Sequence, residues 1–136
     1  ITAIGERRFR IQEMIGDRPY LVGRVDYQPF AIGQPEELQQ EVEQLSPKVR
    51  QYINLLNQIE MVDLDPDNLP QDPLMLGYLA AALLQMPTNE KQKLLESKSG
   101  LELINSTNQV YSREIAFLRA VIERGKDQSK SPVSQN

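Results

Sequence analysis

Residues 72–96 read DPLMLGYLAAALLQMPTNEKQKLLE. Within them, 74–86 form a run that would be apolar on nearly every side of a helix. Such a helix needs other elements around it, because an apolar face in water is costly. The thirteen residues of this run are too few to cross a bilayer, which takes about 20. The stretch therefore predicts a buried central helix in a small globular domain.

Helices are expected on both sides of this central segment. Asp72 is placed to cap it, Pro73 to open it and Pro87 to end it. Thr88 is then placed to cap a short helix over 89–96. Past a break at 97–100, a last helix is predicted from about Leu101 to Arg124. Apolar residues repeat along it at heptad spacing (Leu101, Ile104, Tyr111, Ile115, Leu118 and Ile122), and Asn108 is the one polar residue of that seam.

A further helix is predicted upstream, over 35–59. Pro35 suits its first turn, and apolar residues follow at alternating spacings of four and three. Pro47 lies in the middle, where proline bends or breaks a helix. Ser46 could cap a second helix there, but the stripe keeps its phase across the proline, which favours one long bent helix.

The first 27 residues have the alternation of β structure. In the first run, Phe9, Ile11 and Ile15 are expected on one face, with arginines on the other. A turn signal at 16–19 and a second alternating run up to Tyr27 predict an antiparallel hairpin. A lone hairpin is marginal in water, so these strands are expected to need partners, either from upstream residues or from another chain.

The pattern as a whole predicts an α+β fold with three segments. Residues 1–30 would be the β portion, 35–124 a bundle of about four helices, and 125–136 a disordered tail, because this tail has a single apolar residue, Val133. The chain begins at Ile1 inside an apolar stretch, which suggests a fragment or a processed chain.

Composition narrows the classes of function. The chain has 136 residues, a net charge of −4, and neither histidine nor cysteine. There are thus no disulfides, no thiol chemistry and no histidine base or metal ligand, and a cytoplasmic protein without cofactors is the simplest fit. Residues 1–30 carry five arginines against four acids, far below the basic footprint of a nucleic-acid binder.

The order of these motifs resembles the LON domain, the N-terminal substrate-binding domain of ATP-dependent Lon proteases. The residues that carry the resemblance are GERRFRI at 5–11, PYLVG at 19–23, and the run from Pro87 to Glu96 with EKQ at 90–92 and LLE at 94–96. The resemblance covers about residues 3–124. It implies the last part of a PUA-like β-barrel, without the opening strands, followed by the whole helical bundle.

The resemblance implies a non-catalytic domain that binds unfolded or partly folded protein clients for ATP-dependent proteolysis. Four aromatic residues are the candidate binding site: Phe9, Tyr20, Tyr27 and Phe30. They would cover apolar client segments at the hairpin and its junction with the bundle. The alternative is that Phe9 and Tyr27 fill a barrel interior. Two rival functions remain, a structural or self-association module that uses strand edges and the last helix, and an RNA-binding PUA-like module.

Two other patterns are weaker. Asp63, Asp65 and Asp67 alternate like the start of a calcium loop, but the glycine and glutamate that such a loop requires are missing, which favours a solvated acidic loop. No Walker phosphate loop is present, and the serines around Lys98 have no base beside them, so helix capping is their expected role.

Overall fold

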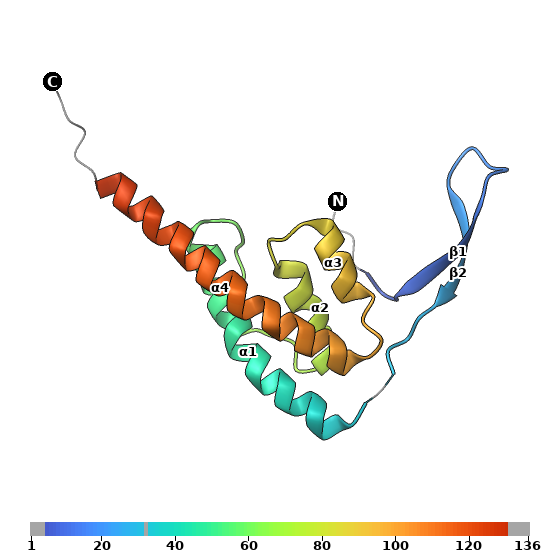
Figure 1. Cartoon of the computed structure of the whole chain (residues 1–136), viewed down its shortest axis with the longest axis horizontal. Coiled ribbons are helices and arrows are strands. Elements are labelled where there is room, and N and C mark those ends of the chain that lie inside the picture. The colour runs from blue at the N-terminus through green and yellow to red at the C-terminus, as the bar shows by residue number, and fades with distance from the viewer. Residues whose placement is uncertain (1–4, 32, 131–136) are drawn as a thin grey trace. The chain divides into compact units, whose positions relative to one another are not determined.

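The computed structural model describes residues 5–31 and 33–130, as a two-stranded antiparallel hairpin followed by four helices (Figure 1). The chain divides after Ala31 into two compact units, the hairpin and the helical bundle. The α+β fold class is as predicted. Within residues 5–31 and 33–130, each helix is either too short or too polar to span a bilayer.

The hairpin consists of β1 (Phe9–Ile15) and β2 (Val22–Tyr27). The strands pair in the register Phe9 to Tyr27, with a bulge that skips Gln12 between Ile11 and Glu13. An extra residue in one strand shifts every later side chain to the other face. The expected sharing of a face by Phe9 and Ile15 is therefore wrong, because the bulge moves Ile15 to the face of Arg10.

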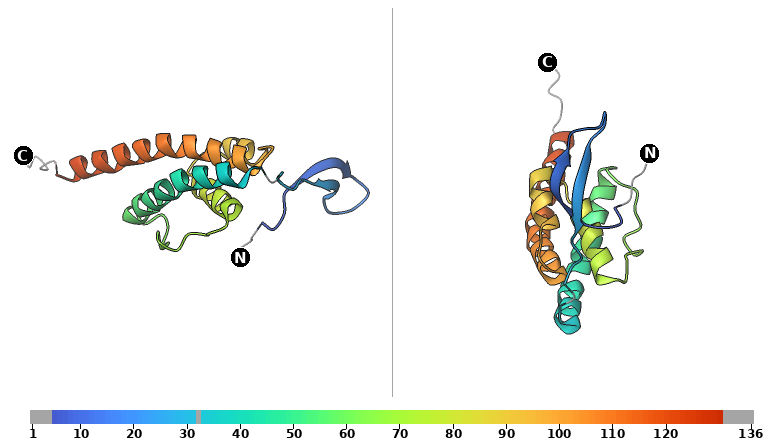
Figure 2. Two further views of the ribbon diagram at one scale, coloured as in Figure 1. Left: turned by 90° about the horizontal axis from the view of Figure 1, so that it is seen from below. Right: turned by 90° about the vertical axis from the view of Figure 1, so that its right-hand side faces the viewer.

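The bundle is organised by two helices that run side by side, α1 (Pro35–Gln58) and α4 (Gly100–Lys130) (Figures 1 and 2). The rings of Tyr52 and Tyr111 meet edge to face, with centroids 5.2 Å apart. As predicted, α1 is one helix that continues through Pro47. Both Pro47 and Glu43 are exposed, so the carbonyl that loses its helical partner there can be hydrated.

The polar residue of the α4 seam is buried and fully paired. Asn108 accepts a hydrogen bond from the Lys48 amine (2.8 Å) and donates one to the Glu41 carboxylate (3.2 Å). Both partners belong to α1. These bonds tie α4 to α1 in one register, as a single polar residue in an apolar seam can do.

The central helix α2 (Pro73–Leu83) differs from its prediction in two ways. It is not covered on every side: Leu76, Gly77 and Ala80 are buried, but Met75 is 57% exposed. It also ends before Met86. Side chains of other helices donate hydrogen bonds to its last carbonyls. The Tyr111 hydroxyl donates to the Ala80 carbonyl (2.8 Å), and the Lys91 amine donates to the Ala82 carbonyl (2.8 Å). The end of α2 is thus set by tertiary hydrogen bonds.

The ends of the other two helices are set locally. The short helix α3 spans Thr88–Leu95 with Pro87 at its N-cap, so the cap expected from Thr88 is wrong. The Pro87 carbonyl instead accepts the first backbone bonds. At the start of α4, the Ser99 hydroxyl accepts from the Glu102 amide (3.1 Å), which confirms the capping role of that serine.

At its other end, α4 continues to Lys130, so the disordered tail expected from residue 125 is wrong for 125–130. Gly125 costs a helix only about 1 kcal/mol, and Lys126, Gln128 and Lys130 after it are good helix formers. Residues 131–136, the rest of the expected tail, lie outside the described part.

Candidate functional site

One face of the hairpin gathers five apolar side chains. Phe9 lies opposite Tyr27 and Ile11 opposite Val25, while the bulge returns Met14 to the same face, opposite Gly23. We call these five residues, Phe9, Ile11, Met14, Val25 and Tyr27, the apolar hairpin face. Gly23 lies on the same face but has no side chain. A Cβ atom there would lie 3.5 Å from both the Ile11 side chain and the Met14 sulfur, so these two side chains occupy the space beside it.

The apolar hairpin face is open to solvent. Phe9 is 52% exposed, Ile11 55%, Met14 53% and Tyr27 55%, and Val25 is half-buried. In most soluble proteins, large apolar side chains on one face of a sheet are covered by another layer. Exposed apolar surface of this kind is typical of a face that another element or another molecule covers.

The opposite face of the hairpin is polar and internally paired. Arg24 forms a salt bridge with Glu13 (3.1 Å), its partner across the strands, and the Gln12 amide donates to the Asp26 carboxylate. Opposite charges therefore meet across the strands on this face. Since these charges are already matched, the polar face offers little net attraction to a polyanion.

Two arginines stack on aromatic rings near the open end of the hairpin. The Arg7 guanidinium lies 4.3 Å from the ring centre of Tyr27, and that of Arg8 lies 3.7 Å from the ring centre of Phe30. Arg8 also donates to the Gln28 carbonyl (2.9 Å). These cation–π contacts hold both rings in place without covering Tyr27.

The four predicted binding residues are thus separated by the structure. Phe9 and Tyr27 lie directly opposite each other on the apolar hairpin face. Phe30 follows β2 and is half-buried under Arg8, and Tyr20 lies in the exposed loop between the strands. Sequence reasoning missed Ile11 and Met14 as site residues. Alternation already placed Ile11 on the face of Phe9, whereas the one signal for Met14 was the glycine at 23, which leaves room for its side chain.

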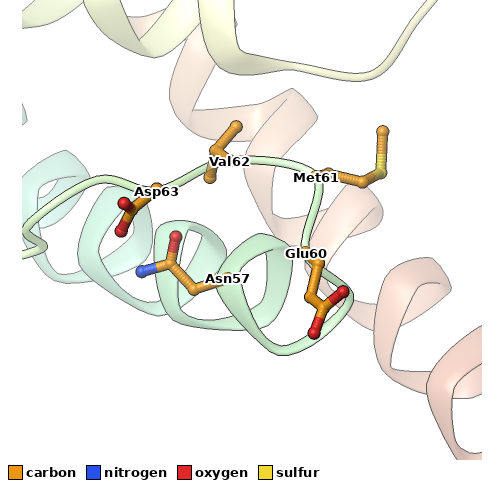
Figure 3. Close-up of a pocket in the computed structure, with 5 residues that line it drawn as sticks. All are labelled: Asn57, Glu60, Met61, Val62 and Asp63. Atoms are coloured by element: carbon orange, nitrogen blue, oxygen red, sulfur yellow. The ribbon is translucent and has the colours of Figure 1, made fainter.

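The described part of the bundle contains, among others, two hollows. The first, of about 450 Å³, lies at the end of α1 and is lined by Asn57, Glu60, Met61, Val62 and Asp63. Figure 3 shows that these side chains point in different directions and do not converge on a common point. The second, of about 250 Å³, lies between α2 and α3 against α4, and it is lined by Tyr78, Ala81, Ala82, Thr88, Lys91, Gln92, Leu95 and Leu103.

The two hollows differ in charge, since Glu60 and Asp63 bring two carboxylates to the first. The second holds no carboxylate, and its one charged group, the Lys91 amine, already donates to Ala82. Among the described residues, no three acidic side chains lie close enough together to hold a metal ion. In the aspartate-rich loop, the Asp65 carboxylate accepts from the Asp67 amide (2.9 Å), which closes a turn.

Comparison with known proteins agrees with the fold. Residues 1–109 match the family described as the ATP-dependent protease La (LON) substrate-binding domain. The chain belongs to this family. The resemblance predicted from the sequence is thereby confirmed. The match includes the hairpin with its apolar face, together with α1, α2, α3 and the first part of α4.

A curated relative supports the same assignment. The chain is 27% identical over 131 residues to the Lon protease of Methylocella silvestris, an alignment that covers 93% of this chain. It spans only 16% of the length of that relative. The comparison therefore concerns the LON region, and the activity of a whole Lon protease is not carried over to this chain by it.

Proposed function

We propose that this LON domain binds exposed apolar segments of unfolded or partly folded client proteins on the apolar hairpin face. In a Lon-type protease, such binding would deliver clients to ATP-dependent proteolysis. The observation that carries the proposal is the exposure of Phe9, Ile11, Met14 and Tyr27 on one face, within a family described as substrate-binding.

The chemistry of this face suits varied clients. Burial of apolar area gives about 25 cal/mol per Å² and needs no particular client sequence. Met14 and Ile11 are aliphatic and can repack, and methionine adapts especially well to irregular partners. Phe9 and Tyr27 offer flat rings with few rotamers, so little entropy is lost when a client covers them.

The contribution of each side chain to the binding free energy follows from the fraction of it that is exposed in the free hairpin. Complete burial of such a side chain is worth about 1.5–3 kcal/mol, and roughly half of each is already covered in the free hairpin. Truncation of Phe9 or Tyr27 to alanine should then cost about 1 kcal/mol, or roughly fivefold in Kd. The double variant should cost about 25-fold if the two contributions add.

The test uses a permanently unfolded, carboxymethylated protein titrated into the full chain and followed by fluorescence anisotropy. F9A and Y27A should weaken binding, whereas I15S should not, because Ile15 lies on the polar face opposite Val22. Y20A should also leave binding nearly unchanged, since Tyr20 lies in the loop. Equal losses in F9A and I15S would show that the apolar hairpin face is not the client site.

A further inference from the structure

The second hollow of the bundle is built by one face of each of two helices. Its lining residues recur at spacings of three and four, at 78, 81 and 82 in α2 and at 88, 91, 92 and 95 in α3. Such spacing places side chains on one face of a helix. Leu103 of α4, which is only 1% exposed, closes the floor. All of these residues belong to the helical bundle, and we call the space between them the α2–α3 hollow.

The size of the α2–α3 hollow is explained by the alanines of α2. Ala81 and Ala82 end at Cβ, so they leave space beside α3 that larger side chains would fill. Packed protein interiors contain few voids larger than a water molecule, and a water takes about 30 Å³. The hollow measures about 250 Å³, and Leu95 at its side is 41% exposed. It is therefore an apolar space that a ligand can reach from solvent.

One cation lies beside this apolar space. The Lys91 amine donates to the Ala82 carbonyl (2.8 Å), and this bond holds it at the wall of the hollow. A protonated amine has three donors, of which the bond uses one. Thr88, one turn earlier on the same face of α3, adds a hydroxyl. No carboxylate is among the lining residues, so the charge of the amine is unmatched within the hollow.

We propose that the α2–α3 hollow binds the C-terminal residue of a polypeptide, with an apolar side chain in the hollow and the terminal carboxylate on the Lys91 amine. An apolar space beside one cation is complementary to an apolar group that carries one negative charge. A C-terminal leucine or phenylalanine has this chemistry. Capture of a terminal carboxylate is a recurring way in which proteins recognise the end of a chain.

Volume and charge disfavour other ligands. Drug-sized ligands occupy about 300–1,000 Å³, so a hollow of about 250 Å³ suits a single large side chain. Nucleotides carry several negative charges, whereas one amine lines this space. An internal apolar segment would cover the amine without pairing it, and a charge that loses water without a partner is costly.

The choice of a polypeptide as the source of the carboxylate rests on the proposed client-binding function, since the family is described as substrate-binding. The hollow would add to that function a preference for clients whose chain ends in an apolar residue. The hollow and the apolar hairpin face lie in different compact units of the chain. Each can therefore be tested with its own probe.

The test uses a fluorescein-labelled peptide of glycine and serine that ends in leucine, titrated into the full chain and followed by fluorescence anisotropy. This probe has no internal apolar segment, so it reports on the chain end. The same peptide with a C-terminal amide should bind about tenfold more weakly, because a charge-assisted hydrogen bond is lost. A peptide that ends in serine should also bind about tenfold more weakly, because it leaves the hollow unfilled.

Three variants locate the site. K91M nearly keeps the length of the side chain and removes its charge, so it should bind the free acid about as weakly as the parent binds the amide. The matched control is K93M, because Lys93 is an exposed lysine of α3 that does not line the hollow. A82L retains the amine but narrows the hollow, and it should weaken binding at least about tenfold. Leucine is a good helix former, so A82L decides the matter if K91M fails to fold.

Equal binding of the free acid and the amide would overturn the proposal, as would a K91M chain that binds like K93M or an A82L chain that binds like the parent. Octanoate and N-acetyl-leucine, used as competitors, distinguish a fatty acid from a chain end, and tighter binding of octanoate would overturn the assignment to a polypeptide. The apolar hairpin face is tested by F9A and Y27A with an unfolded client. Either proposal can therefore fail while the other holds.

Discussion

Replacement of Tyr111 by phenylalanine removes one hydroxyl from the centre of the bundle. That hydroxyl donates to the Ala80 carbonyl at 2.8 Å, and both residues are fully buried. Neither residue is exposed to bulk solvent, so the carbonyl is expected to be left with one hydrogen bond fewer. A buried polar group that loses its partner costs about 1–3 kcal/mol. Y111F should therefore lower the free energy of unfolding by an amount in this range.

The matched control is Y52F, which removes a hydroxyl from the other ring of the same edge-to-face pair. The Tyr52 hydroxyl accepts from the Gln85 amide at 3.1 Å. Gln85 is exposed, so water can replace the hydroxyl, and the cost should be about 0.5–1 kcal/mol. Both variants keep the phenyl ring, so packing of the rings does not distinguish them.

Thermal unfolding followed by circular dichroism at the helix band measures both variants. For a unit of this size, 1 kcal/mol corresponds to roughly 4–8 °C in Tm. Y111F should therefore melt clearly below Y52F, and Y52F slightly below the parent. A Y111F chain that melts with the parent, or above Y52F, would refute the conclusion that the Tyr111 hydroxyl holds the end of α2.

Three further outcomes are expected. Burial raises the pKa of Tyr111 and of Tyr52, so the folded chain keeps protons that the unfolded chain releases near pH 10. The free energy of unfolding should therefore be flat below about pH 9 and fall above pH 10, less steeply in Y111F. Urea midpoints that do not fall above pH 10 would contradict this. Glu60 ends α1 with a positive φ of 57°, which favours glycine, so E60G should raise the urea midpoint, by about 0.5–1 kcal/mol of stability, and E60A should not. S99A should lose about 1 kcal/mol with the cap of α4, and S99D should restore most of it in the same urea titration.

Elements with a strong period were predictable from the sequence. The stripe over 35–59 gave α1 as one helix despite Pro47, and the heptad seam located α4 and identified Asn108 as its polar member. In both cases the pattern extends over many turns, so one exceptional residue does not change it. The alternation of the first 27 residues likewise predicted the hairpin.

The candidate site was only partly predictable. Phe9 and Tyr27 were identified from their aromatic character, and the structure places them in direct opposition. Met14 was assigned no role, because strict alternation places it with the arginines. One skipped residue, Gln12, reverses that assignment. A bulge depends on the fit between two strands, and neither strand alone specifies it.

The sequence by itself determined the class of fold and the number and order of the helices, because these follow from periodicity and from residues that act on their nearest neighbours. The family was indicated separately, by the resemblance of its motifs to the LON domain. Tertiary structure decided where α2 stops, since hydroxyl and amine groups from α4 and α3 replace its last helical hydrogen bonds. It also decided which side chains share a hairpin face. Both outcomes depend on contacts between segments distant in sequence, and local propensity does not encode such contacts.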